Sequence, residues 1–100
     1  MKLTNKQIST AIENVIFDTA GEIETTDFTN SESIDCLIES LKYTQYLMVY
    51  LRSLAADMKP AEYFAETSDY SISESNDYLK MLLEGSEEAF ERFKQSLNKQ

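Results

Sequence analysis

The chain has 100 residues, which is enough for one domain with its own hydrophobic core. Its 18 acidic and 9 basic residues give a formal net charge of −9, without the basic patch that direct binding to nucleic acid or to a membrane surface needs. Only two glycines and one proline interrupt the chain, which argues against a sandwich or barrel with many tight turns. We expect one helical domain over residues 1–100.

The first expected helix begins at a capping box, in which the Thr4 hydroxyl and the Gln7 side chain each accept from a free backbone N–H. The apolar residues that follow have helical spacing and form one stripe, which we expect to be buried: Ile8, Ala11, Ile12, Val15 and Ile16. Phe17 lies off this stripe, and we expect it to pack against a later part of the chain. Gly21 can adopt the left-handed conformation that follows a helix, so we expect the helix to end near Ala20.

Residues 21–30 form the first expected connector. They are rich in Thr, Asp and Asn, whose side chains bond to nearby backbone groups and compete with helix formation. Phe28 is the large apolar residue of this segment, and we expect it to insert into the core from the loop.

A long central helix is expected next, over about residues 31–58. Thr29 or Ser31 is expected to cap it, and Pro60 ends it because proline disfavours helix at the residue before it. Its second half, which includes residues 46–51, is apolar over most of its circumference. Such a helix is buried on several sides, so other elements or a second copy of the chain must surround it. Its first half carries a single apolar stripe: Ile34, Leu37, Ile38 and Leu41.

Three shorter helices are expected after the proline. The first covers residues 60–67 and has the proline at its first position. The second opens at a capping box that begins at Ser71, and it ends at Gly85. The last is capped by Ser86 and covers about residues 87–97. Together the patterns predict an all-α fold, a compact bundle of four to five helices around one long central helix.

Catalytic and metal-binding side chains are scarce. The chain has no histidine, which removes the commonest general base and metal ligand. One cysteine, Cys36, cannot build a zinc site, and there is no glycine-rich phosphate loop. The carboxylate pairs Glu62 with Glu66 and Asp35 with Glu39 have a spacing that can hold Mg²⁺ or Ca²⁺, but we expect ordinary solvated faces. We therefore expect no catalytic site, no metal, no cofactor and no enzyme.

The expected compartment is the cytoplasm. Cys36 has no second cysteine to pair with, which fits a reducing environment, and we expect it to be a small packing residue. Residues 1–7 lack the apolar segment of a signal peptide. The longest apolar run, residues 46–51, is far shorter than the ~20 residues that span a bilayer.

Acidic residues are concentrated in two blocks that contain no Lys or Arg, residues 13–39 and residues 60–79. If the blocks share a face, they form one strongly negative patch that attracts basic surfaces. Otherwise the acidity only maintains solubility. The first block contains eight acids: Glu13, Asp18, Glu22, Glu24, Asp27, Glu32, Asp35 and Glu39.

Tyrosines accompany this charge. Tyr43, Tyr46 and Tyr50 have the i, i+3, i+7 spacing of one helix face, and the other three tyrosines lie in or beside the second acidic block. Tyrosine is enriched at interfaces because it joins a large apolar ring to a polar hydroxyl. A stripe at helical spacing is also typical of a core, so both interpretations stay open here.

These features favour a protein-binding module, an inhibitor or adaptor, whose partner protein presents a basic surface. One version is a nucleic-acid mimic, whose carboxylates occupy the Lys and Arg sites of a nucleic-acid-binding protein. Phage-encoded anti-defence proteins and immunity proteins include small acidic helical chains, a similarity of size, charge and class alone. The alternative is a helical homodimer with a structural, assembly or chaperone role. The candidate contact residues are Glu62, Tyr63, Glu66, Asp69, Tyr70, Asp77, Tyr43 and Tyr46.

Overall fold

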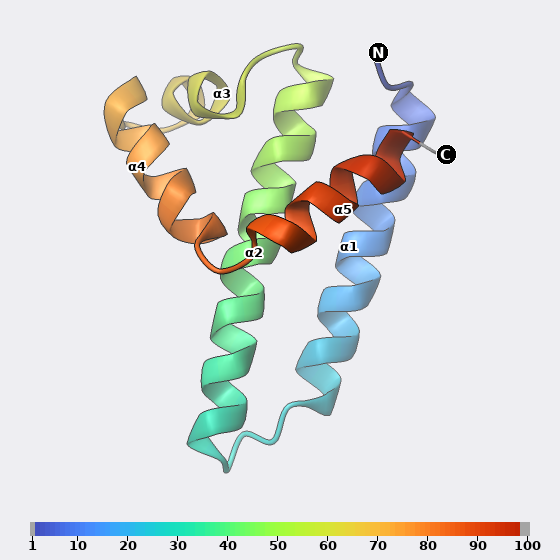
Figure 1. Ribbon diagram of the computed structural model, residues 1–100, viewed down its shortest axis with the longest axis vertical. Coiled ribbons are helices and arrows are strands. Elements are labelled where there is room, and N and C mark those ends of the chain that lie inside the picture. The colour runs from blue at the N-terminus through green and yellow to red at the C-terminus, as the bar shows by residue number, and fades with distance from the viewer. Residues whose placement is uncertain (1, 99–100) are drawn as a thin grey trace.

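The computed structural model describes residues 2–98 and confirms the all-α fold (Figure 1). Within these residues the long central helix is the second of five. The helices are α1 (Asn5–Thr25), α2 (Ser31–Ala55), α3 (Pro60–Thr67), α4 (Ile72–Leu83) and α5 (Glu87–Asn98).

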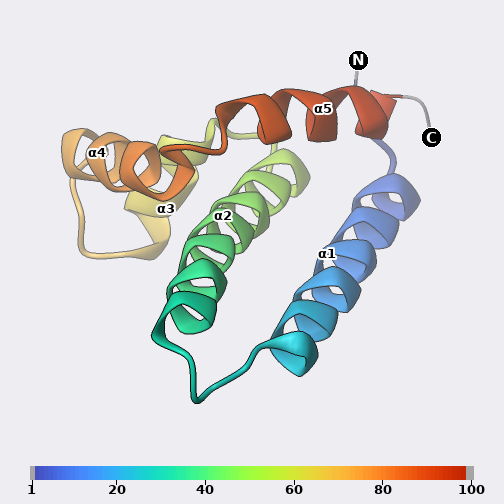
Figure 2. The same cartoon turned by 60° about the horizontal axis from the view of Figure 1, so that its bottom comes forward.

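The two long helices, α1 and α2, form an antiparallel hairpin whose tip projects away from the other helices (Figures 1 and 2). α3 and α4 pack on the C-terminal half of α2, and α5 crosses the upper halves of both hairpin helices. The molecule measures 42 × 33 × 22 Å. Apart from Asp18, which lines a groove with α5 residues, no other helix among residues 2–98 covers the lower part of the hairpin, residues 16–41, which we call the distal hairpin.

α1 begins as predicted but ends five residues late. Gln7 N–H donates to Thr4 Oγ1 at 3.1 Å, and Thr4 N–H donates to Gln7 Oε1 at 2.8 Å. The helix continues through Gly21, so the predicted end near residue 20 is wrong. A single glycine disfavours a helix by only about 1 kcal/mol, and good helix-forming residues surround this one. The Thr26 hydroxyl instead closes the helix by donating to the Glu22 carbonyl at 2.7 Å, and the connector is shortened to residues 26–30.

α2 differs from its prediction at both ends. Its N-cap is Asn30, whose side chain accepts from Ser33 N–H at 3.1 Å, and neither Thr29 nor Ser31 caps it. The helix ends at Ala55 because Asp57 adopts a positive φ of 57°. Met58 N–H then bonds to the Ser53 carbonyl at 2.9 Å, which is the bond of a Schellman motif. The helix therefore ends three residues before the predicted end near residue 58, at a left-handed aspartate and not through Pro60.

The three short helices confirm their predicted starts. Glu74 N–H donates to Ser71 Oγ at 3.1 Å, and Ser71 N–H donates to Glu74 Oε1 at 3.0 Å, which completes the second capping box. Gly85 has a φ of 86° in the turn after α4. Ser86 occupies the N-cap position of α5, since its carbonyl accepts from Phe90 N–H at 3.0 Å.

The core consists of two clusters that share α2. The first joins α1, α2 and α5, and the second lies between α2, α3 and α4. The apolar half of α2 is therefore surrounded by helices of its own chain, as its sequence predicts. The buried members of the first cluster are Ile8, Ala11, Val15, Leu47, Leu51, Phe90 and Leu97, and those of the second are Val49, Leu79 and Leu82.

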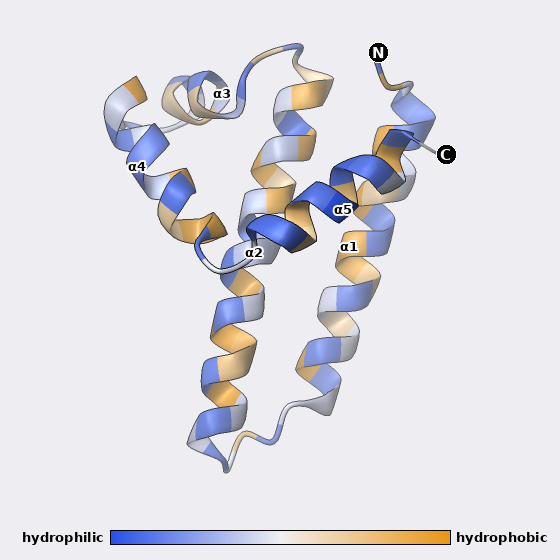
Figure 3. Ribbon diagram, in the orientation of Figure 1, coloured by the Kyte–Doolittle hydropathy of each residue, from blue (hydrophilic) through white to orange (hydrophobic). Residues whose placement is uncertain are grey.

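The distal hairpin contradicts four burial predictions. Phe28 is 60% exposed in the connector, and Phe17 is 78% exposed. Ile16, which was expected in the buried stripe, and Cys36, which was expected to pack, are both exposed as well. The reason is shared, because no helix of the described chain lies over this part of the hairpin. Figure 3 shows apolar segments recurring along the lower parts of both helices.

Candidate protein-binding surfaces

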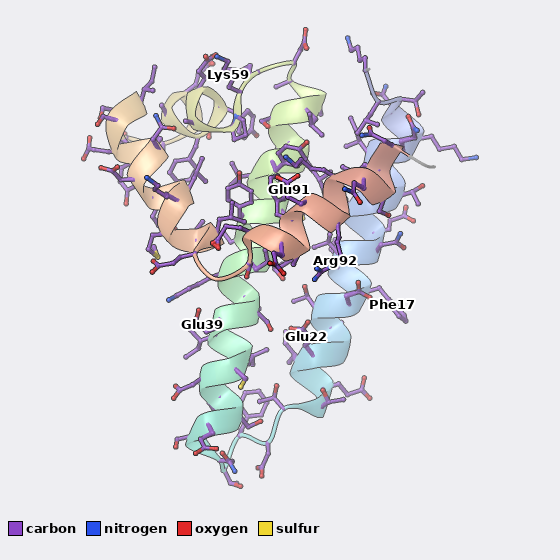
Figure 4. All side chains as sticks on the ribbon, viewed as in Figure 1. Phe17, Glu22, Glu39, Lys59, Glu91 and Arg92 are labelled. Carbon is purple, nitrogen blue, oxygen red and sulfur yellow. The ribbon has the colours of Figure 1, made fainter. Side chains whose placement is uncertain are left out.

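The first candidate surface is the groove between α3 and α4. It has a volume of about 740 Å³, and three of the predicted contact residues line it: Tyr46, Glu62 and Asp77. Lys59 and Lys80 line it too (Figure 4 labels Lys59). The fold thus brings bases from just outside the second acidic block back beside its acids. The charge of this groove is mixed, whereas the sequence block alone is purely acidic.

The other predicted contact residues of the second block lie outside this groove. Glu66 and Asp69 are exposed on α3 and on the loop after it, and Tyr63 is half-buried against the second cluster. Tyr70 is exposed, and its ring contacts Phe64 and Tyr78 with centroid distances of 5.6 and 5.9 Å. These ring contacts fix the loop that joins α3 to α4. Part of the Tyr70 ring is left for a partner.

The tyrosine stripe of α2 lies under α5. The rings of Tyr46 and Tyr50 are nearly perpendicular to the Phe90 ring, and their centroids are 5.0 and 4.8 Å from its centroid. Burial raises the pKa of Tyr43, Tyr46 and Tyr50 above the usual 10.0, because the ionised phenolate loses solvation. All three rings pack against the first cluster, and each remains partly exposed to solvent.

The two acidic blocks do not form one patch. The first follows α1 and the first half of α2 around the hairpin tip, whereas the second lies on α3 and α4 at the opposite end of the long axis (Figures 1 and 2). The protein therefore has two separate acidic surfaces. Lys59 and Lys80 lie beside the second, whereas the first lies on a longer segment, residues 7–41, that has no Lys or Arg.

A second candidate surface, which the predicted contact residues missed, is an apolar strip on the distal hairpin. We define the hairpin strip as Ile16, Ile23, Ile38 and Leu41, whose side chains are between 38% and 56% exposed. Their spacing along each helix was visible in the sequence. Their exposure was not, since it depends on which helices cover the hairpin.

One contact fixes the register of the strip. Thr19 Oγ1 and Thr44 Oγ1 are 3.1 Å apart across the two helices. One turn toward the tip from this pair, Ile23 is level with Leu41. One turn in the other direction, Ile16 is level with Met48. The strip therefore runs along both helices at matched heights and forms one continuous face.

The strip points away from α5. Asn14 and Leu47 lie beside α5 residues in a shared groove. Ile23 is nine residues from Asn14, and Ile38 is nine residues from Leu47. Nine residues are two and a half helical turns, so each pair points in opposite directions. The face opposite α5 is therefore apolar and uncovered.

Acids border this face. Glu13 and Glu24 stand on the outer side of α1, together with the exposed ring of Phe17, at the i, i+4, i+11 spacing of one helix side. Asp35 stands beside Ile38 on α2, three residues earlier. Figure 4 shows Phe17 pointing away from the bundle. The first base after this segment, Lys42, is paired with Glu39 at 3.2 Å.

Other classes of site find little support within residues 2–98. No cluster of three or more Cys, Asp or Glu side chains is arranged to hold a metal ion. None of the described helices combines the length and apolarity needed to cross a bilayer. The chain matches no protein-family model, no curated protein and no solved structure. Function has to be argued from these surfaces.

Proposed function

We propose that the protein is a non-catalytic binding module, an inhibitor or adaptor, that binds a basic surface of a partner protein. The observation that carries this proposal is the distal hairpin, where an uncovered apolar strip lies on a segment, residues 16–41, that carries seven acids and no Lys or Arg along the chain. Exposed apolar patches with a polar rim are typical of interaction sites. The strip supplies area to bury, and the acids select the partner.

The negative charge of this surface favours a partner with a basic surface. A surface of one sign speeds association with a surface of the opposite sign, and salt weakens that attraction. Basic surfaces of this kind include those that bind nucleic acid, so the carboxylates would act there as phosphate mimics, as in phage-type anti-defence proteins. We place this activity in the cytoplasm, since the chain has a single, exposed thiol.

A helical homodimer remains the second candidate, because the hairpin strip can also pack on its own copy. The apolar half of α2 gives little support to a dimer, because α1, α3, α4 and α5 already surround it. Two copies would also bring together two net charges of −9. Sedimentation at micromolar concentration separates the candidates, and we expect a monomer.

The test of the proposal is affinity capture from host lysate at low and high salt, with the wild type and two triple reversals to lysine. One reversal changes Glu13, Glu24 and Asp35 on the hairpin, and the other changes Glu62, Glu66 and Asp69. We expect the wild type to capture a basic protein at low salt, to release it at high salt, and to lose it on hairpin reversal. If every protein that the wild type captures is also captured by both reversed variants, the protein is not an acidic binding module.

A further inference from the structure

We propose that the hairpin strip is a docking groove for one amphipathic helix of the partner, with an apolar face and flanks of Lys and Arg. That helix would lie along α1 and α2 and complete a three-helix bundle. This inference rests on the proposed function and adds the form and chemistry of the segment that binds.

The position of the strip on two antiparallel helices suits a helix as the bound segment. Two antiparallel helices leave a groove between them, and the ridges of a third helix fit such a groove. With its half-buried neighbours Ile34 and Met48, the apolar face on α2 covers residues 34–48. At about 1.5 Å per residue, this length accepts a helix of roughly 15 residues.

The charges select a basic helix. Glu13 and Glu24 lie on the outer side of α1 beside the strip, and Asp35 lies one turn before Ile38 on α2. A helix lying in the groove would place its flanking residues beside these carboxylates. Lys or Arg at those positions would be attracted, whereas Asp or Glu would be repelled. A second copy of this acidic chain suits the groove less well than a basic helix does.

Phe17 adds a contact for that basic flank. Its ring is the most exposed large apolar side chain among residues 2–98, and Glu13 and Glu24 lie on the same side of α1. A Lys or Arg that reaches either carboxylate would pass over the ring, where its aliphatic stem and its charge both interact favourably. This placement gives the exposed ring a role in binding.

The test uses a synthetic peptide of about 18 residues that forms an amphipathic helix, with leucines on one face and Lys and Arg on its flanks. A fluorophore on Cys36 reports binding from outside the strip, because Cys36 is eleven residues, about three turns, from Leu47 and so lies on the α5 side. We expect the double variant Ile23→Gln, Leu41→Gln to bind the peptide at least tenfold more weakly than the wild type.

A matched control tests whether the peptide binds exposed apolar side chains non-specifically. Ile72 and Met81 on α4 are 55% and 42% exposed, which is comparable with Ile23 and Leu41, and they lie outside the hairpin. The double variant Ile72→Gln, Met81→Gln should bind the peptide as the wild type does. Glutamine is a good helix former, so neither variant should lower the thermal midpoint appreciably.

Three results would overturn the inference. One is a peptide that fails to bind, or that binds both double variants equally. Another is equal binding of a peptide with Glu in place of every Lys and Arg. The third is a wild-type dimer that Ile23→Gln, Leu41→Gln dissociates, which would give the strip to a second copy. The proposed function fails separately, when the capture experiment yields no basic partner.

Discussion

Leu51 is the residue on which the first cluster depends most. Its side chain is fully buried between α1, α2 and α5. We expect Leu51→Ala to lower the free energy of unfolding by about 2–5 kcal/mol, because a buried leucine leaves a cavity when truncated. Leu41→Ala, at an exposed position of the same helix, should lower it much less. Urea denaturation measures both, and a loss below about half a kcal/mol at Leu51 would show that this cluster is not the core.

Ser53 is a small residue on the buried side of α2. It is fully buried, and its hydroxyl donates to the Tyr50 carbonyl at 2.6 Å. We expect Ser53→Leu to lower the free energy of unfolding by about 1–3 kcal/mol through overpacking. Ser53→Ala keeps the small volume and should be tolerated better. The idea of close packing fails in denaturant unfolding if leucine is tolerated as well as alanine.

The buried tyrosines predict loss of stability at high pH. Because burial raises the pKa of Tyr43, Tyr46 and Tyr50, these groups ionise near pH 10.0 when unfolded and only at higher pH when folded. Their contribution is complete below pH 10.0 and is lost as pH rises through the folded values. Spectrophotometric titration should show late-ionising tyrosines that disappear in the triple Tyr→Phe variant. Ionisation of these three tyrosines at the ordinary pKa of 10.0 would contradict their burial.

At the scale of elements, the capping box at the start of α4 is the local signal that can be tested most cleanly. We expect Ser71→Ala to lower the free energy of unfolding by about 1 kcal/mol, since a backbone N–H of the first turn loses its acceptor. Ser73→Ala, an exposed position in the same turn, is the matched control and should have little effect. Equal effects of the two changes in thermal unfolding would show that the cap does not stabilise α4.

The same box makes α4 sensitive to acid. The Ser71 N–H bond to the Glu74 carboxylate lowers the pKa of Glu74 below its ordinary 4.5. Its stabilisation is therefore complete above pH 4.5 and is lost as pH falls through the lower folded value. Carboxyl chemical shifts should show this lowered pKa in the wild type. The Ser71 hydroxyl also lowers the pKa of Glu74, so Ser71→Ala should raise that pKa toward 4.5.

The sequence predicts the helices better than their ends. Capping boxes and proline act within a few residues, so the starts of α1, α3 and α4 can be read locally. Gly21 and Asp57 show the limit. A glycine permits the left-handed conformation without requiring it. An aspartate can adopt that conformation when the hydrogen bonds that follow it stabilise the turn. Both choices are settled by the turns on either side.

At the scale of the whole molecule, the arrangement of the helices decides what each surface becomes. The sequence predicts two acidic blocks, but the fold puts them at opposite ends and brings Lys59 and Lys80 beside the second. The spacing of Ile34, Ile38 and Leu41 predicts an apolar face. Whether such a face is core or surface depends on where α5 crosses, which no local pattern specifies.

The central claim is that the distal hairpin is the recognition surface, and isoleucine methyl resonances of the labelled protein test it most directly. Ile16, Ile23 and Ile38 lie on the strip, whereas Ile72 is equally exposed on α4. On addition of the captured basic partner, we predict that the first three methyl signals shift and that the Ile72 signal does not. A shifted Ile72 signal beside three unmoved strip signals would contradict the account and move the binding surface to α3 and α4.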